Sequence, residues 1–431
     1  MTNELKKRIA DINSGIIPEG YKKTKVGIVP VEWKQVKLGE ILKQRKTLMC
    51  VSEDAPLLSF TIEEGVIEPI DKKTNKRDFL IKDISTKKFA LTEVGDIIYN
   101  PANLKFGAIH RNNLRKGVVS PIYGIFYGKQ DSVFMGNLLH NQRFIDYAKI
   151  YTEGTVEKLK TLKAETFLKL KVVIPPLPEQ QKIAEILSTQ DKLIELQEKK
   201  IEKLKELKKA YLQKMFPKKG SKYPEIRFKG FTDAWEQRKL GEALSLLKDG
   251  THGTHKNSDD GVFLLSAKNI KNGEIIIDET SDRKISIEEF EGIHSTFKLQ
   301  KDDVLLTIVG SIGEVAILNN PDIMTFQRSV AFLRPKGNLI SSFLKTEIES
   351  DNFQKELSDR KSQSAQPGVY LGELEKIPFA IPIMEEQKAI GAYFRNLDTL
   401  ITLHQRKLEK EKEKKKALMQ LLLTGKVRVK L

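Results

Sequence analysis

The side chains best suited to chemistry lie in a glycine-rich loop, Asp249-Gly250-Thr251-His252-Gly253-Thr254-His255. Two histidines three positions apart, His252 and His255, could hold a metal ion between them. The only acidic residues near them are Asp249 and the pair at 259–260, and no cysteine lies in the region. Because these do not complete a recognisable set of ligands at metal-binding spacing, we expect no metal site here.

A second candidate is the pair Gln327-Arg328. Arginine can donate two hydrogen bonds to O6 and N7 of guanine, and glutamine can pair with N6 and N7 of adenine. The pair could therefore recognise base edges in DNA. It follows a predicted strand, so burial within the fold is the competing interpretation.

Two further segments resemble catalytic motifs only in part. Asn100-Pro101-Ala102-Asn103 has neither the second proline nor the terminal aromatic with which an adenine methyltransferase holds and stacks a flipped base. We interpret it as a turn that ends a strand. Gly310-Ser311-Ile312-Gly313 lacks the Lys-Ser/Thr that completes a phosphate-binding loop, so it predicts a turn or a close approach to a DNA backbone.

Composition narrows the class of protein. The 431 residues carry a formal net charge of +16, which favours a polyanionic partner, although solvated surface lysines would give the same charge. The single cysteine, Cys50, excludes disulfides within the chain and zinc sites rich in thiolates. Residues 1–10 contain no apolar segment, and no run of eighteen apolar residues occurs, so we expect a cytoplasmic protein without membrane contact.

These segments belong to a chain that repeats itself. Trp33 and Trp235 lie in matching segments at an offset of 202 residues (235 − 33), and Ile174 and Ile381 lie in matching segments at an offset of 207 (381 − 174). The second copy has therefore gained five residues, most simply in the loop around 250–261. Short β-branched runs with turn signals predict that each copy holds a mixed α+β domain.

Each domain is followed by a long amphipathic helix. Residues 179–216 contain no glycine or proline, and apolar residues recur at heptad spacing there and in the second copy. We expect two helices paired as an antiparallel coiled coil, with polar residues on the seam that fix the register. A helix of this length spans about 57 Å at 1.5 Å per residue, so the pair could act as a ruler. The alternative is two separate helices, each lying on its own domain.

The chain resembles the specificity subunit of type I restriction-modification systems. The resemblance is carried by residues 249–255, by Phe263 to Ile270 with Gly273, and by two signatures, Ile174-Pro175-Pro176-Leu177-Pro178-Glu179-Gln180 and Ile381-Pro382-Ile383-Met384-Glu385-Glu386-Gln387. It covers nearly the whole chain. It implies a first target-recognition domain at 1–175, a central helix at 176–218, a second target-recognition domain at 219–382 and a C-terminal helix at 383–431.

The resemblance also implies a function. Such a subunit is non-catalytic: each recognition domain reads one half of an asymmetric bipartite target in double-stranded DNA. The helices set the spacer and dock two modification subunits, which methylate adenine N6 with S-adenosylmethionine. Restriction subunits, which use ATP and Mg²⁺, complete the complex, and the chain itself needs no cofactor. The alternatives are a self-sufficient DNA methyltransferase or nuclease, and a coiled-coil adaptor that binds only proteins.

In the second domain the resemblance implies that the glycine-rich loop faces DNA, and in the first domain candidates are chosen by residue type. In the second domain the DNA-facing candidates are Thr251, His252, His255, Lys268, Asn269, Gln327 and Arg328. The first domain has no Gly-Thr-His loop, so we expect a different half-site there. Its candidates are Lys72, Lys73, Lys76 and Arg77 for phosphates and Asn103, Lys105, Arg111 and Asn112 for the groove, with a solvated surface as the alternative.

The ends of the two helices carry more apolar residues than a two-helix seam requires. We therefore expect part of the docking of the modification subunits there, on Tyr211, Met215, Phe216, Met419, Leu422 and Leu423. The lysine-rich faces of the helices suit either solvent or non-specific contact with phosphates.

Overall fold

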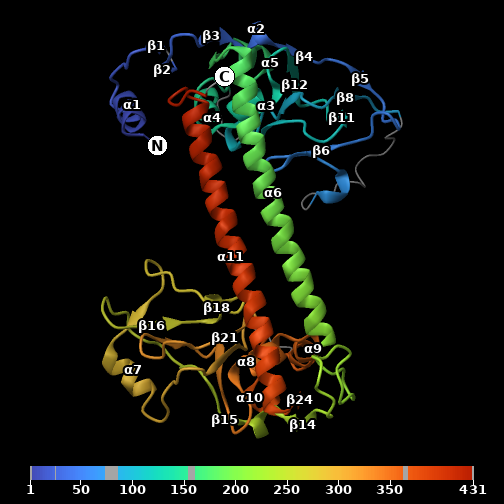
Figure 1. Cartoon of the computed structure of the whole chain (residues 1–431), viewed down its shortest axis with the longest axis vertical. Helices are drawn as coiled ribbons and strands as arrows, with labels where there is room; N and C mark the ends of the chain where they lie inside the picture. Colours follow the sequence, from blue (N-terminus) through green and yellow to red (C-terminus); the bar gives the residue numbers. More distant parts are fainter. Residues whose placement is uncertain (1, 25, 73–85, 154–160, 363–366, 430–431) are drawn as a thin grey trace. The chain divides into compact units, whose positions relative to one another are not determined.

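The computed structural model describes residues 2–24, 26–72, 86–153, 161–362 and 367–429. The chain forms two compact units, residues 1–196 with 408–431, and residues 197–407. Each unit holds one α+β domain and part of each long helix (Figure 1). Within the described ranges, no helix combines the length and the apolar character needed to cross a membrane.

The first unit is built on a four-stranded antiparallel sheet of order β10-β9-β12-β4 and a three-stranded sheet of order β11-β8-β5. The strands are β4 Leu42–Gln44, β5 Leu48–Met49, β8 Phe89–Thr92, β9 Ile97–Tyr99, β10 Ile109–Arg111, β11 Gly117–Val119 and β12 Gly124–Gly128. Three two-stranded pairs accompany them: β1 Tyr21–Thr24 with β2 Gly27–Pro30, β3 Lys34–Lys37 with β13 Lys171–Ile174, and β6 Ser59–Thr61 with β7 Gly65–Ile67. The helices are α1 Asn3–Asn13, α2 Leu38–Ile41, α3 Ser132–His140, α4 Gln142–Lys149 and α5 Ala164–Lys169, with 3-10 turns η1 Pro69–Asp71 and η3 Leu104–Phe106.

The second unit repeats the larger sheet in the same order, β21-β20-β23-β15. A three-stranded sheet of order β19-β16-β22, a hairpin of β17 and β18, and the pair β14 with β24 complete its strands. The strands are β14 Glu236–Lys239, β15 Leu244–Asp249, β16 Val262–Leu265, β17 Ile270–Lys271, β18 Glu274–Ile275, β19 Lys284–Ile285, β20 Val304–Thr307, β21 Val315–Ile317, β22 Met324–Phe326, β23 Val330–Pro335 and β24 Pro378–Ile381. The helices are α7 Ile287–Ile293, α8 Ser341–Glu349, α9 Asp351–Asp359 and α10 Leu371–Leu374, with 3-10 turns η5 Leu240–Ala243 and η6 Ala267–Asn269.

The smaller sheets are where the two copies differ. In the second unit β16 runs parallel to β22, and Leu264 pairs with Thr325. Among the described residues of the first unit, the matching place has one isolated parallel bridge, Leu57 with Val118, and the strands β5 and β8 are added. The larger sheet is therefore the common scaffold, whereas the smaller sheet carries the differences.

The glutamine of each Ile-Pro signature has a structural role. Gln180 donates to the carbonyl of Pro175 at 2.8 Å and accepts from the backbone N–H of Asp131 at 3.2 Å. It therefore ties the end of β13 to the residue that caps α3. Gln387 makes the equivalent bonds, to the carbonyl of Pro382 at 2.9 Å and from the N–H of Ile340 at 3.1 Å.

The glutamate of each signature is a buried anion with an arginine partner. Arg428 donates to both carboxylate oxygens of Glu179, at 2.6 and 3.0 Å, and Trp33 donates its indole N–H to the same group at 3.1 Å. Arg227 likewise binds both oxygens of Glu386, at 2.6 and 2.7 Å. These hydrogen bonds raise the pKa of both arginines. In each unit, the segment that follows one long helix therefore holds the first turn of the other.

The long helices are α6 Leu177–Lys214 and α11 Met384–Leu422, and they run antiparallel in each unit (Figure 1). The polar residues that interrupt the predicted seam pair across it. In the first unit Gln190 donates to Glu411 at 2.6 Å and Lys415 lies 2.5 Å from Asp191. In the second unit Gln197 binds His404 at 2.9 Å and Lys208 lies 2.6 Å from Asp398. The predicted fold class, two α+β repeats with long helices paired antiparallel, is confirmed.

Candidate nucleic-acid interface

The glycine-rich loop of the second domain lies directly on the segment that follows β22. A Cβ atom at Gly250 would come within 2.2 Å of the carbonyl oxygen of Phe326, so only glycine fits there. The next residue, Thr251, donates its N–H to Phe326 at 2.9 Å and accepts from the N–H of Arg328 at 3.0 Å. The loop and the Gln327-Arg328 pair, which are far apart in the sequence, thus form one surface.

The two histidines of the loop have different surroundings. His255 is largely buried, and its ring nitrogens contact Thr251 Oγ1 and Glu289 Oε1, both at 2.8 Å. His252 is exposed, and among the described residues its ring contacts Asp249 alone, at 2.7 Å. Across the described part of the chain, no group of three or more potential metal-ligating side chains occurs. In this arrangement His255 shapes the loop, and His252 is the histidine open to a ligand.

Gln327 and Arg328 connect the loop to the 3-10 turn Ala267–Asn269. The N–H of Gln327 donates to Leu265 at 2.8 Å, and Ser329 Oγ accepts from the N–H of Ala267 at 3.0 Å. Arg328 is exposed, and among the described residues neither its side chain nor that of Gln327 has a hydrogen-bond or ion-pair partner. The burial alternative is therefore wrong for Arg328, whose guanidinium is free to contact a ligand.

Lys268 and Asn269 are neighbours in the sequence but differ in burial. Lys268 is exposed and lies 2.8 Å from Asp282. Burial opposes ionisation of Asp282, but the hydrogen bonds from Lys268 and from the N–H of Asp278 outweigh it and lower its pKa. Asn269 is buried, and its amide group bonds to Ser266, Ile276 and Asp282. The expectation that Asn269 pairs with a base is corrected: in this fold its amide holds the turn that presents Lys268.

The structure describes only some of the first-domain candidates. Lys73, Lys76 and Arg77 lie outside the described residues, and Lys72 is half-buried. Asn103 and Lys105 lie just beyond the end of β9 at Tyr99, whereas Arg111 pairs with Ile97 at its start.

Two first-domain candidates already have partners. Arg111 donates to Ser132 at 3.0 Å and to Asn113. Asn112 is fully buried and bonds to Thr92, Arg115 and Leu114, so the expectation that it enters a DNA groove is corrected.

Sequence reasoning missed the residues that orient this surface. Glu289 holds His255, Asp282 holds Lys268 and Asn269, and Ser311 approaches the carbonyl of Ala267 at 3.4 Å. Each of these residues is distant in sequence from the group that it contacts, and no local sequence pattern predicts the contact. Only the Gly310-Ser311 turn gave a signal, and the structure places it beside the candidate surface.

The family follows from a comparison with known proteins. The model of the type I restriction modification DNA specificity domain matches this chain twice, over residues 30–206 and 232–412. The chain belongs to this family. A type I restriction enzyme specificity subunit of Methanocaldococcus jannaschii is 26% identical and aligns with 96% of this chain and 97% of its own length.

Solved structures support the fold. One, reported as the structural basis of complex assembly and conformational transition of the type I R-M system, has a TM-score of 0.56 and 16% identity, covering 93% of this chain and 99% of that chain. The type I restriction-modification S subunit of M. genitalium has a TM-score of 0.52 and 15% identity, covering 93% and 96%.

The residues predicted to dock partners of a specificity subunit are mostly in the interior. Leu422 and Leu423 are buried in the core of the first unit, and Met215 and Phe216 in that of the second. Met419 and Tyr211 are half-buried against the same cores. The apolar surplus at the helix ends therefore anchors each helix in a domain, and the predicted docking surface is corrected.

A different apolar surface is exposed on the helices, away from their seam. Leu193 and Leu400, related by the 207-residue offset (400 − 193), are 41% and 43% exposed. Leu196 and Leu403, related by the same offset, are 61% and 54% exposed. Each helix thus shows two leucines three positions apart on one face, where the paired helix does not cover them.

Proposed function

We propose that this chain is the non-catalytic DNA sequence-specificity subunit of a type I restriction-modification complex. Each α+β domain reads one half of an asymmetric bipartite site in double-stranded DNA. The observation that carries the proposal is the second-domain surface, where His252, Lys268 and Arg328 are exposed beside the half-buried Thr251. The first domain shares the scaffold of this surface but carries different residues. Arginine and lysine donors suit phosphates and guanine edges.

Catalysis is assigned to partner subunits. S-adenosylmethionine serves the modification subunits, and ATP with Mg²⁺ serves the restriction subunits. Two modification subunits dock on the exposed leucines, one on Leu193 with Leu196 and one on Leu400 with Leu403. This assignment is supported by the similar exposure of the two sites, because a repeated surface suits two copies of one partner.

Domain exchange tests the assignment of half-sites. Residues 41–170 are replaced by the matching segment of another specificity subunit, and the complex with its modification subunits methylates genomic DNA. We expect single-molecule sequencing to show a new first half-site and an unchanged second one. A change in both halves, or in neither, would contradict independent reading.

A second experiment tests the assignment of catalysis. The purified chain is incubated with DNA, S-adenosylmethionine, Mg²⁺ and ATP, and we expect neither methylation nor cleavage until the partner subunits are added. Activity of the chain alone would favour the self-sufficient enzyme.

A change in the length of the long helices tests whether they set the spacer. Seven residues inserted into each of α6 and α11 keep the heptad pattern and add about 10.5 Å at 1.5 Å per residue. At 3.4 Å per base pair, we expect the spacer to lengthen by about three base pairs. An unchanged spacer would contradict the ruler.

A further inference from the structure

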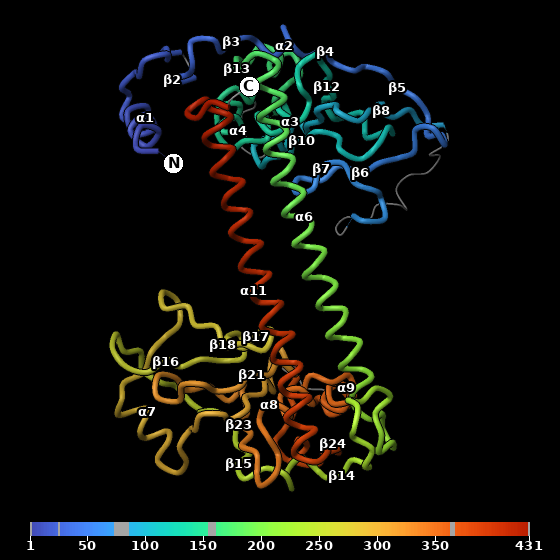
Figure 2. The backbone as a smooth tube through the Cα atoms, in the orientation of Figure 1, coloured from blue at the N-terminus to red at the C-terminus, as the bar shows by residue number. Residues whose placement is uncertain are grey.

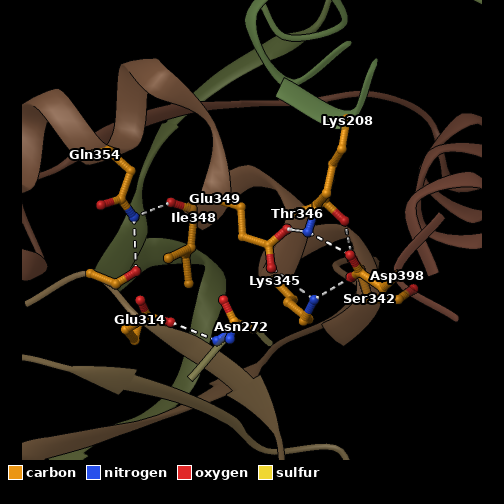
Figure 3. A network of polar contacts seen from close by, with 11 residues as sticks. Lys208, Asn272, Glu314, Ser342, Lys345, Thr346, Ile348, Glu349, Gln354 and Asp398 are labelled. Carbon is orange, nitrogen blue, oxygen red and sulfur yellow. Dashed lines mark hydrogen bonds and ion pairs between the residues drawn. The ribbon is translucent and has the colours of Figure 1, made fainter. Parts of the chain in front are cut away.

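Four charged side chains from three helices meet in the second unit. Lys208 comes from α6, Lys345 and Glu349 from α8, and Asp398 from α11 (Figure 3). Lys208 lies 2.7 Å from Glu349 and 2.6 Å from Asp398, and Lys345 lies 2.8 Å from Glu349 and 2.9 Å from Asp398. Each lysine therefore contacts both carboxylates, and the four form a closed ion-pair cluster of zero formal charge.

The ion-pair cluster is largely buried. Its four side chains are between 13% and 22% exposed. Burial opposes protonation of Lys345, but the charges of Glu349 and Asp398 outweigh it and raise its pKa, so the lysine stays charged. Because all charges are paired, removing one would leave a poorly solvated charge without a partner. The cluster is thus sensitive to substitution in a way that surface ion pairs are not.

The cluster fixes α8, an element of the recognition domain, against both long helices. A second close contact supports this attachment: a Cβ atom at Gly391 of α11 would come within 2.4 Å of Ser342 Oγ on α8. The two helices thus approach without an intervening side chain. The direction of α8 on the helix pair is set by contacts at both ends of the helix.

The attachment continues to the DNA-facing segment. The tip of the β17–β18 hairpin lies on the cluster, since a Cβ atom at Gly273 would be 2.9 Å from Lys345 Nζ. Its neighbour Asn272 donates its N–H to Glu314 at 3.0 Å. The hairpin directly follows the turn that presents Lys268, and Figure 2 shows it beside α11. A continuous path of contacts therefore joins the helix pair to the candidate interface.

The first domain has no counterpart of the two α8 charges. The helices α3 and α8 align at the residues that cap the next helix, Asn141 and Ser350, at a local offset of 209 (350 − 141). Lys345 and Glu349 therefore correspond to Gly136 and His140. The ion pair between the long helices, Lys415 with Asp191, is kept.

We infer that the ion-pair cluster of Lys208, Lys345, Glu349 and Asp398 positions the second recognition domain on the helix pair, and so sets the spacer at which the second half-site is read. The inference rests on the proposed function. The side chains act through α8 and the β17–β18 hairpin and do not touch DNA, so they are positioning residues. Their loss changes the spacer at which the second domain reads its half-site. The base preference of that half-site stays unchanged.

The test uses the double variant Lys345→Met with Glu349→Gln, which keeps the Lys208–Asp398 pair and the net charge. The full chain is assembled with its modification subunits, and methylated sites are sequenced. We expect methylation at spacers one base pair longer or shorter to rise about tenfold relative to the unsubstituted chain, the change that 1.4 kcal/mol would produce. Base preferences in both half-sites should be unchanged.

Two controls separate positioning from general stability. Lys345→Arg keeps the charge and should retain the original spacer. Lys219→Met, which removes an exposed partner of Glu356 in the same unit, should leave the spacer unchanged.

The outcomes separate the two proposals. An unaltered spacer in the double variant, with methylation either normal or uniformly reduced, would overturn the inference. Absence of methylation by the unsubstituted complex would refute the proposed function instead.

Discussion

Gln197 and His404 occupy the same position in the two copies of the repeat and bind each other, Oε1 to Nδ1, at 2.9 Å. Their separation is the repeat offset itself, 207 residues (404 − 197). Each residue of the pair therefore corresponds to the other in the repeat. The pair lies at the midpoint of the correspondence between the two antiparallel helices. By the same offset, Asp191 corresponds to Asp398 and Lys415 to Lys208, so the ion pair Asp191–Lys415 has its counterpart in Asp398–Lys208.

Replacing this pair by two leucines tests the cost of polar residues on the seam. Polar residues at such positions specify register at a cost in stability. We expect Gln197→Leu with His404→Leu to raise the free energy of unfolding by about 1 kcal/mol, measured by denaturant unfolding. Gln197→Leu alone should not raise the free energy of unfolding, because His404 then loses its hydrogen-bond partner. An equal gain in the single variant would contradict this account.

Glu347 predicts a pH dependence of the second domain. It is almost fully buried, its Oε2 atom has no hydrogen-bond partner among the described residues, and burial raises its pKa to about 8. The unfolded chain loses this proton near 4.5. The contribution of Glu347 to folding is therefore full below pH 4.5 and is lost as pH rises to about 8.

The matching residue of the first copy, Leu138, supplies the variant. We expect Glu347→Leu to stabilise the second domain at pH 8 by about 2 kcal/mol and to flatten its stability between pH 5 and 8. Thermal unfolding across this range measures both. Destabilisation at pH 8 would show that the carboxyl has a favourable role.

Arg227→Met should destabilise the second unit strongly. The substitution leaves the carboxylate of Glu386 buried without its bidentate partner. Breaking a buried pair from one side costs about 3 kcal/mol or more. Denaturant unfolding measures the loss, and Arg227→Met with Glu386→Gln should recover part of it; a double variant as unstable as the single one would argue against an unpaired charge.

Leu196→Glu tests docking on the first helix. A charge in the centre of an apolar contact should remove one modification subunit and leave the other, and native mass spectrometry counts the subunits. Leu403→Glu should have the same effect on the other site. Lys192→Glu, a nearby exposed position, makes a larger charge change and should keep both subunits. Retention of two subunits by both leucine variants would place docking elsewhere.

Arg328→Ala should change recognition in the second half-site only. Its guanidinium is exposed and unpaired within the described structure, as expected of a group that contacts a base. Loss of a bidentate contact costs about 1–3 kcal/mol and relaxes the preference at one base pair. Lys268→Ala should instead weaken binding for all sequences, with a shallower salt dependence. Competition binding with single-base variants distinguishes the two outcomes.

The sequence by itself determined the repeat, the two α+β domains and the helix pairing. These depend on periodic patterns and on matched segments, and a pattern of apolar residues every three or four positions fixes which face of a helix is covered. The polar residues at Gln190, Gln197 and Lys208 could be placed on the seam for the same reason. The signature glutamates were visible, although their arginine partners were not.

Only the tertiary structure decided what each polar side chain does. Asn269 and Asn112 carry the same chemistry as a base-reading asparagine, yet both are buried and satisfied by partners distant in sequence. Met215 and Leu422 look like docking residues in the sequence but fill the domain cores. Burial depends on what the rest of the chain packs against a residue, and a local pattern does not contain that information.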